Sequence, residues 1–411
     1  MRGLGVRVGS SALNYQALRA LGSRVPRWTG GWMPWLGLST YTLPPLPGAD
    51  WVRLRPLLAG ICGSDITMLT GKASAALTPF SSFPAILGHE VVAIVEEAGS
   101  GAGVVTGQRV VLDPIISCAV RGLDPCPGCA DGTPALCRRA AEGTLSPGML
   151  IGFCRDLPGA WSEGMLAHAS QLHPVPESLS DEAAALAEPI ACGLHAVLAE
   201  LPVEGERALV IGGGAIGLGT LAALRMATPA VDTTIVVRHP RQSELAEQLG
   251  AAHVVVDRHG DGARRAAVQH AGASEHRTLV GGAALTGGFD AVYECAGSAA
   301  SLEAALAVTA PRGRVALIGT LGDVARIDLT LAWARELRIT GSYVYGREAS
   351  VPGQPHTIDH LLRLLSEDGA PNVDELVTHR FPLADWREAL RTAMAGGRRG
   401  AVKVVFDHRA G

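Results

Sequence analysis

The stretch 208–225, ALVIGGGAIGLGTLAALR, constrains the fold of this chain more than any other part of the sequence. Ala208–Ile211 is a short apolar run, which is typical of a buried parallel strand. A turn with the spacing G-x-G-x-x-G follows, and Leu218–Met226 is predicted to be a helix. A strand, a glycine turn and a helix in this order predict a dinucleotide-binding unit.

Each glycine of this turn has a physical role in such a unit. Gly212 permits the tight turn, Gly214 lets the backbone approach a pyrophosphate, and Gly217 lets helix and strand pack closely. The diphosphate is expected at the helix N-terminus, whose free N–H groups favour anions, and Ile216 lies in the same turn. A glycine turn without a ligand is the alternative, because the chain has 51 glycines. The strand before and the helix after favour the dinucleotide.

The composition is that of a globular protein with a sizeable core. The chain has 411 residues, enough for two ordinary domains, of which 47% are hydrophobic and 18% charged. The net charge of −4 offers no basic excess for a nucleic-acid surface. No run reaches the roughly 18 apolar residues of a membrane span. We therefore expect neither nucleic acid nor a membrane as a partner.

The cysteines and the N-terminal segment bear on the compartment. Four of the eight cysteines lie within 118–137, which predicts metal binding in a reducing cytoplasm and not a disulfide framework. The first 49 residues contain no acidic residue and five arginines: Arg2, Arg7, Arg19, Arg24 and Arg27. They resemble an organelle transit peptide. We favour an N-terminal extension of a cytoplasmic enzyme over residues 1–44, in which Trp28, Trp32 and Trp35 pack on the protein body.

The order of predicted elements indicates an α/β protein with two kinds of domain. Up to Asp113 the chain shows short strands and glycine turns, which are typical of a β-rich, barrel-like domain. From Arg207 strands and helices alternate, which predicts a doubly wound parallel sheet. The predicted strands here are Ala208–Ile211, Thr234–Val237, His253–Val256, Ala291–Glu294, Arg314–Ile318 and Arg338–Thr340.

Three residues far apart in sequence are candidate zinc ligands. Cys62 lies in a glycine turn, His89 follows a glycine, and Glu188 precedes Pro189. Thiolate, imidazole and carboxylate all bind zinc, and three protein ligands leave a fourth position open. Taken singly, each residue is more simply interpreted as a buried thiol, a hydrogen-bonded histidine or a carboxylate at a helix end.

Four motifs in one order carry a resemblance to a known family. They are G-x-C-G-S-D at 60–65, G-H-E at 88–90, A-E-P at 187–189 and the glycine turn at 212–217. Together they resemble the zinc-dependent medium-chain alcohol and polyol dehydrogenases over residues 45–406. The resemblance implies a GroES-like catalytic domain at 1–188, completed by 343–411, and a Rossmann domain at 189–342.

The same resemblance implies roles for the residues of these motifs. Cys62, His89 and Glu188 match the catalytic zinc ligands, in the branch of the family that uses glutamate as the third. The other matching residues are Glu90, a carboxylate beside the metal; Asp65, which orients ligands; and Ser64, which takes the substrate proton. Zinc would polarise the alcohol oxygen, and hydride would pass to the nicotinamide.

Two further positions near this centre are singled out. Thr67 stands where the family often has the histidine that ends the proton relay, so the relay is expected to run through water or the cofactor ribose. Cys192 follows Glu188 by four residues and is expected near the nicotinamide, although as a residue type it is also an ordinary core thiol.

The cysteine cluster matches the family's structural zinc lobe. Cys126, Cys129 and Cys137 have its C-x2-C-x7-C spacing. Cys118 lies eight residues before Cys126, where three are usual, and we interpret 119–125 as a loop insertion. The resemblance implies a second zinc bound by all four thiolates. A degenerate lobe or a disulfide is the alternative.

The end of the second Rossmann strand bears on cofactor choice. An NAD enzyme places an acidic residue there to bind the ribose 2′-OH. This chain has Arg238, His239 and Arg241 instead. We therefore expect NADP(H) in preference to NAD(H), although a solvated arginine loop is also possible.

The sequence thus predicts a zinc-dependent enzyme that reversibly oxidises an alcohol, in the class of secondary alcohols, polyols or sugar-like alcohols. One alternative is a metal-independent enone or quinone reductase of the same superfamily, and the other is a non-catalytic dinucleotide-binding protein. Both fit less well, because the ligand set and Ser64 are complete. The resemblance also implies a homodimer or homotetramer, with 338–345 contributing an edge strand.

Overall fold

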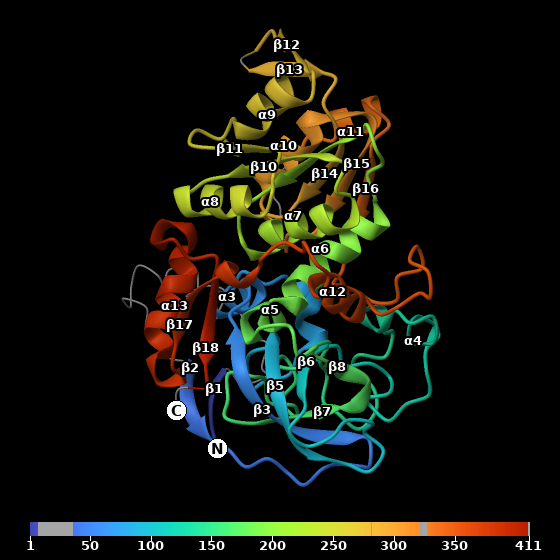
Figure 1. Ribbon diagram of the computed structural model, residues 1–411, viewed down its shortest axis with the longest axis vertical. Helices are drawn as coiled ribbons and strands as arrows, with labels where there is room; N and C mark the ends of the chain where they lie inside the picture. The colour runs from blue at the N-terminus through green and yellow to red at the C-terminus, as the bar shows by residue number, and fades with distance from the viewer. Residues whose placement is uncertain (7–35, 281, 321, 323–326, 410–411) are drawn as a thin grey trace.

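The computed structural model describes residues 1–6, 36–280, 282–320, 322 and 327–409. The chain forms two lobes (Figure 1). One lobe holds a six-stranded parallel sheet between helices, and the other holds a seven-stranded sheet that is mostly antiparallel. The C-terminal part of the chain returns to the second lobe, where Met1 also lies. This architecture confirms the predicted α/β class.

The parallel sheet has the strand order β11-β10-β9-β14-β15-β16, in which the sequence order reverses between β9 and β14. Its strands are β9 (Arg207–Ile211), β10 (Asp232–Val237), β11 (His253–Val256), β14 (Phe289–Glu294), β15 (Thr309–Leu317) and β16 (Arg338–Gly341). Helices cover both faces, so the central strands are buried on both sides. This burial explains their continuous apolar runs.

The helices of this lobe alternate with its strands. They are α6 (Ala187–Ala199), α7 (Ala215–Ala227), α8 (Pro240–Gln248), α9 (Gly262–His270), α10 (Ala299–Val308) and α11 (Thr330–Ala334). A hairpin of β12 (Ser274–Arg277) and β13 (Ala283–Thr286) projects at the far end of the lobe (Figure 1). Sequence analysis did not predict α9 or this hairpin.

The second lobe has the strand order β17-β18-β3-β5-β6-β8, with β7 also paired to β3. Its strands are β3 (Trp51–Gly60), β5 (Val91–Ala98), β6 (Arg109–Leu112), β7 (Met165–His168), β8 (Leu172–Pro174), β17 (Val377–Phe381) and β18 (Lys403–Asp407). The α-helices are α3 (Gly63–Leu69), α4 (Pro127–Ala130), α5 (Asp181–Ala185), α12 (Thr357–Leu365) and α13 (Trp386–Ala395). Short 3₁₀ turns occupy Ala75–Phe80, Pro134–Leu136, Ala169–Gln171, Asp374–Leu376, Leu383–Asp385 and Gly396–Arg399.

The two ends of the expected N-terminal extension form strands in this lobe. β1 (Arg2–Val6) pairs antiparallel with β2 (Leu36–Thr40) and with β4 (Ala85–Ile86). Leu4 is completely buried, and its backbone N–H donates to the carbonyl oxygen of Trp161 at 2.8 Å. Sequence analysis did not predict β1 and β2. Arg7, Arg19, Arg24, Arg27 and the tryptophans at 28, 32 and 35 lie outside the described residues.

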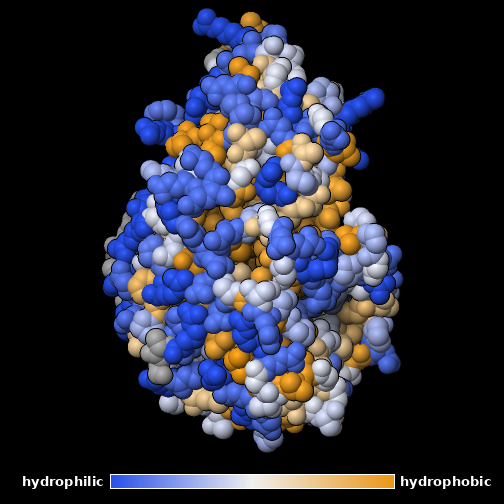
Figure 2. All heavy atoms as spheres, viewed as in Figure 1, coloured by the Kyte–Doolittle hydropathy of each residue, from blue (hydrophilic) through white to orange (hydrophobic). Residues whose placement is uncertain are grey.

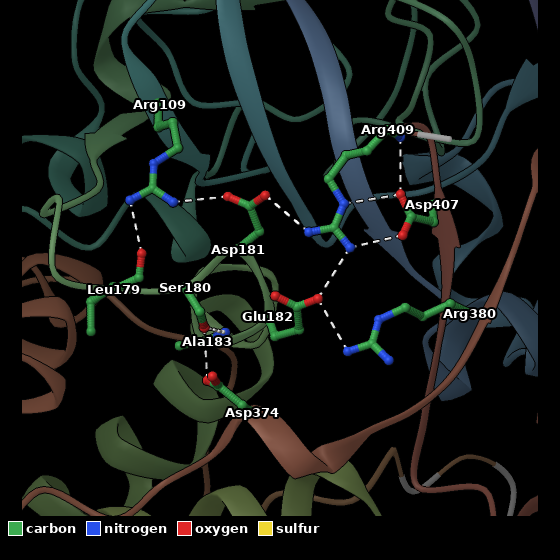
Figure 3. Close-up of polar contacts among 10 residues, drawn as sticks. All are labelled: Arg109, Leu179, Ser180, Asp181, Glu182, Ala183, Asp374, Arg380, Asp407 and Arg409. Atoms are coloured by element: carbon green, nitrogen blue, oxygen red, sulfur yellow. Dashed lines mark hydrogen bonds and ion pairs between the residues drawn. The ribbon is translucent and has the colours of Figure 1, made fainter. Parts of the chain in front are cut away.

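Ion pairs fasten α5 to the returning C-terminal strands (Figure 3). The Asp181 carboxylate accepts hydrogen bonds from Arg109 at 2.8 Å and from Arg409 at 3.1 Å. Glu182 accepts from Arg380 and Arg409, both at 3.1 Å. The acidic first turn of this short helix therefore joins β6 to the end of β18.

Among the described residues, no helix is long and apolar enough to cross a membrane.

Candidate active site and metal centres

A thiol, an imidazole and a carboxylate meet between the start of α3 and the start of β5. The candidate ligand atoms of Cys62, His89 and Glu90 all lie within 4.8 Å of one another. His89 and Glu90 are buried, at 3% and 1% exposure, whereas Cys62 is half-buried. These residue types in this spacing fit a zinc ion. Glu90, which the sequence analysis put beside the metal, is part of this group.

Asp65 holds both predicted ligands in place. One of its carboxylate oxygens accepts a hydrogen bond from the Cys62 backbone N–H at 3.0 Å, and the other lies 3.4 Å from His89 Nδ1. Burial opposes the charged form of His89, but the Asp65 carboxylate outweighs this effect and raises the pKa of His89 well above its usual range. A carboxylate on Nδ1 leaves Nε2 as the nitrogen that can bind a metal. Metal binding there would displace a proton.

Ser64 and Thr67 lie on α3, a helix where the sequence analysis expected a turn. The hydrogen bond from the Cys62 N–H to Asp65 caps this helix, a local signal that the glycines around it obscured. Ser64 Oγ lies 3.4 Å from His89 Nε2, at the metal-facing side of the ring. The Thr67 hydroxyl donates to the Gly63 carbonyl oxygen at 2.8 Å, within the helix. Ser64, and not Thr67, therefore faces the candidate metal.

Lys403, on β18, is a charged residue of this centre that the sequence analysis did not predict. Its Nζ lies 2.7 and 2.6 Å from the two carboxylate oxygens of Glu90, and both residues are buried. Burial alone would lower the pKa of Lys403, but the Glu90 carboxylate reverses this and raises it. A lone lysine near the end of the chain gives no sequence signal, because only the pairing of β18 with β3 brings it to Glu90.

Glu188, the predicted third ligand, faces the same centre from the first turn of α6. Its carboxylate accepts a hydrogen bond from the Tyr345 hydroxyl at 3.2 Å and lies 4.0 Å from Cys192 Sγ. Burial and the neighbouring charge of Glu90 raise the pKa of Glu188 to about 7. Glu188 is not within 4.8 Å of all three ligand atoms of the first group. The structure therefore groups Glu90, and not Glu188, with Cys62 and His89.

The four clustered cysteines converge in the lobe that carries α4. Cys118 Sγ lies 3.6 Å from Cys137 Sγ, and Cys126 Sγ lies 4.0 Å from the same atom. Tetrahedral zinc with bonds of about 2.3 Å separates its sulfurs by about 3.8 Å, whereas a disulfide would hold them about 2.0 Å apart. The Arg138 backbone N–H donates to Cys126 Sγ and lowers the pKa of this thiol to about 6. The arrangement fits a four-thiolate metal site.

The insertion between Cys118 and Cys126 has a packing role of its own. Arg121, within it, is completely buried, and its guanidinium donates to the backbone carbonyls of Glu142, Leu145, Ser146 and Gly148. This contact fastens the insertion to the loop that follows the cluster. Cys118 therefore reaches the other three cysteines despite the longer spacing.

The glycine turn has the geometry that its spacing predicts. Gly212 has a φ of +118°, which is open to glycine and strained for other residues. A Cβ on Gly217 would lie 1.8 Å from the Gly212 carbonyl oxygen. A Cβ on Gly214, at the N-terminus of α7, would have nothing within 4 Å. The open side of Gly214 and the first turn of α7, which includes Ile216, form a place for an anion.

The three basic residues after β10 have different surroundings. β10 ends at Val237, so Arg238 is the first residue beyond the strand, and it is exposed. His239 caps α8, and its ring lies against Gly397 of the C-terminal part. Arg241 is paired with Glu244 at 3.1 Å and with Glu375 of the other lobe at 3.0 Å. Arg238 makes no ion pair with any described residue.

A cavity of about 810 Å³ opens beside these residues, between α8 and the segment that contains β17. Pro240 and Arg241 line it on one side, and His379 and Arg380 line it on the other. Hydrophilic residues dominate the face shown in Figure 2, and hydrophobic ones appear among them at the waist between the lobes.

Comparison with protein families assigns both lobes. The sequence profile of the alcohol dehydrogenase GroES-like domain matches residues 48–177, and that of zinc-binding dehydrogenases matches residues 215–367.

Individual relatives match over nearly the whole chain. Sorbitol dehydrogenase of Arabidopsis thaliana is 31% identical over 91% of this chain and 94% of its own. L-idonate 5-dehydrogenase of Vitis vinifera is 30% identical over 90% of this chain and 92% of its own. Among solved structures, a zinc-binding dehydrogenase of Sinorhizobium meliloti bound to NADP is 28% identical, covers 99% of both chains and has a TM-score of 0.72.

Proposed function

Since this chain belongs to the family of zinc-dependent medium-chain alcohol and polyol dehydrogenases, we propose that it transfers hydride between a secondary alcohol, polyol or sugar-like alcohol and NADP(H). The observation that carries the proposal is the convergence of Cys62, His89 and Glu90 beside Ser64. Relatives named for sorbitol and idonate support a polyhydroxylated substrate.

The residues of the centre divide the work of alcohol oxidation among them. Cys62 and His89 Nε2 would hold zinc, with Glu90 or Glu188 as the carboxylate ligand. Bound zinc supplies a Lewis acid for the alcohol oxygen, and the nicotinamide supplies the hydride acceptor. The Ser64 hydroxyl, 3.4 Å from His89 Nε2, is placed to take the alcohol proton. Asp65 orients His89, and Lys403 donates to the carboxylate of Glu90.

The acidic surroundings of the centre support this assignment. Two buried carboxylates, Glu90 and Glu188, and one thiol face a single buried lysine. A divalent cation would balance these charges. A metal-independent reductase does not require such a set of ligands. A non-catalytic protein does not require the Ser64 hydroxyl beside them.

The preference for NADP(H) rests on the end of β10. Val237 and Arg238 occupy the positions where an acidic residue would bind a free 2′-OH. The exposed Arg238 guanidinium is available to a 2′-phosphate. Solved proteins of this fold carry either cofactor, since the one from Sinorhizobium meliloti was solved with NADP and one from Escherichia coli with NADH.

We also propose that the enzyme is a homodimer or homotetramer in the cytoplasm. β16 is an edge strand of the parallel sheet, and Ile339 on it is 40% exposed. Trp333, on the preceding α11, is 75% exposed, so this edge offers apolar surface to a second copy. A monomeric mass in light scattering at micromolar concentration would refute the oligomer.

All eight cysteines are free, which suits a reducing compartment.

The proposed activity is tested by steady-state kinetics on secondary alcohols, polyols and sugar alcohols with both cofactors. We expect zinc-dependent turnover, with kcat/KM highest for a polyol and NADP. Cys62→Ser should abolish turnover while the circular dichroism spectrum is retained. Reduction of an enone that survives removal of zinc would support the reductase instead. Dinucleotide binding without any turnover by the zinc-loaded protein would support the non-catalytic alternative.

A further inference from the structure

A third group of potential metal ligands lies in the catalytic lobe. Asp113 follows β6, His173 lies on the neighbouring β8, and His356 immediately precedes α12. The candidate ligand atoms of these three residues lie within 4.8 Å of one another. None of them belongs to the two metal sites described above.

His173 has the hydrogen-bonding pattern of a metal-bound histidine. Its Nδ1 lies 2.7 Å from a carboxylate oxygen of Asp359, which fixes the proton on Nδ1. Its Nε2 therefore carries a lone pair, yet it is buried and has no hydrogen-bond partner among the described residues. The whole residue is only 6% exposed. A carboxylate on one nitrogen and a free second nitrogen is the arrangement by which proteins orient histidine ligands.

The other two members present their free atoms to the same place. Asp113 uses one oxygen to accept the Ile115 backbone N–H at 2.9 Å, and its second oxygen lies 3.6 Å from His356 Nε2. His356 Nε2 is also buried without a hydrogen-bond partner in the described part of the chain. The rings of His173 and His356 are stacked, with centroids 4.5 Å apart and an interplanar angle of 23°, so one ring must turn for both Nε2 lone pairs to point at the same ion. Ligands about 2.1 Å from tetrahedral zinc are separated by about 3.4 Å, close to the observed 3.6 Å.

We propose that Asp113, His173 and His356 bind a third divalent cation, Zn²⁺, which fastens α12 to the sheet of the catalytic lobe. Two imidazoles and a carboxylate suit zinc, and Asp113 together with Asp359 would balance its two charges. The buried His173 Nε2 has no hydrogen-bond partner among the described residues, and the cation would supply one. The proposal does not depend on the proposed function.

Binding of the cation would change which ring nitrogen of His356 carries the proton. The Ile358 backbone N–H now lies 3.3 Å from His356 Nδ1 and caps α12 through it. Coordination through Nε2 requires the proton on Nδ1, so this cap contact is given up when the metal binds. The cation then takes over the role of holding the start of α12, which packs against α6 and its Glu188.

The test is the zinc content of the full-length protein after equilibration at a fixed micromolar concentration of free Zn²⁺. We expect three zinc ions per chain in the wild type and two in His173→Gln. Asp113→Asn should also hold two, and it keeps the oxygen that accepts the Ile115 N–H, so its fold is protected. His276→Gln, at an exposed histidine of β12, is the matched control and should hold three.

Two outcomes overturn the proposal: two zinc ions or fewer in the wild type, or three in both His173→Gln and Asp113→Asn. Cys62→Ser separates it from the proposed function, because this variant should lose one ion and keep the third site. The thermal midpoint of the wild type should also rise with Zn²⁺, whereas that of His173→Gln should rise less.

Discussion

The Lys403 ammonium group lies 2.6 and 2.7 Å from the two oxygens of the Glu90 carboxylate, and both side chains are almost completely buried. This contact joins β18, near the end of the chain, to the first residue before β5. It also brings the only buried lysine among the described residues to the candidate zinc centre.

Replacing Lys403 by methionine should lower the free energy of unfolding by about 3–5 kcal/mol, because the Glu90 carboxylate would remain buried without its partner. Urea unfolding of the zinc-free protein measures this loss. The double variant Lys403→Met, Glu90→Gln should recover most of it, since neither charge is then buried. A single variant as stable as the wild type would show that the pair contributes nothing.

An added methyl group should affect stability at one glycine of the turn and dinucleotide binding at another. Gly217→Ala should cost about 3 kcal/mol of stability, because its Cβ would lie 1.8 Å from the Gly212 carbonyl oxygen. Gly214→Ala should leave stability unchanged, because nothing lies within 4 Å of the added Cβ. It should weaken dinucleotide binding about tenfold or more, by occupying the side where the pyrophosphate approaches. Thermal unfolding and fluorescence titration with NADPH separate the two effects, and equal binding by the wild type and Gly214→Ala would contradict the site.

Arg238→Asp should reverse the cofactor preference. Loss of a charge-assisted pair with the 2′-phosphate is worth about 1.5–3 kcal/mol, which is roughly ten- to a hundredfold in kcat/KM for NADP. The new carboxylate should accept a hydrogen bond from the 2′-OH of NAD. Arg241→Ala is the matched control, since Arg241 is already paired with Glu244 and Glu375. The assignment fails if the wild type prefers NAD or if Arg238→Asp leaves the ratio unchanged.

Cys126→Ser should remove the zinc of the four-cysteine site and destabilise the lobe around α4. Serine is a poor zinc ligand, and the Arg138 N–H lowers the pKa of this thiol to about 6, which favours the thiolate that binds zinc. We expect one zinc ion fewer per chain and a lower thermal midpoint, with faster proteolysis between residues 118 and 148. Cys154→Ser, at a buried cysteine outside the cluster, should keep its full zinc content.

Arg409→Ala should reduce stability by at most about 1 kcal/mol at pH 7, because its ion pairs in Figure 3 are partly exposed. The hydrogen bond from Arg409 lowers the pKa of Asp407 below its usual value. A depressed carboxyl pKa stabilises the fold above the unfolded value of about 3.9 and ceases to do so as the pH falls through the folded value. The difference between variant and wild type should therefore shrink from pH 7 to pH 3. Arg312→Ala, which breaks a more exposed pair, should show no difference at either pH.

The local elements and the motifs could be predicted from the sequence, because each has a short-range cause. The run of apolar residues at 208–211 and the glycine spacing after it require one kind of strand, turn and helix, and β9, the turn and α7 have that form. The C-x2-C-x7-C spacing likewise predicts the cysteine cluster that the structure shows. The helix after Cys62 was missed, since its cap is a contact between two residues inside a glycine-rich motif.

The partners of the buried charges were decided only by the tertiary structure. Nothing in the sequence connects Lys403 to Glu90 or Tyr345 to Glu188, because the returning strand β18 and the turn before α12 create these contacts. The strands at both ends of 1–44 and the Asp113, His173 and His356 cluster also depend on the pairing of distant segments. Sequence patterns report periodicity and spacing within one segment. The free energy of burying a charge depends instead on which distant segment lies against it.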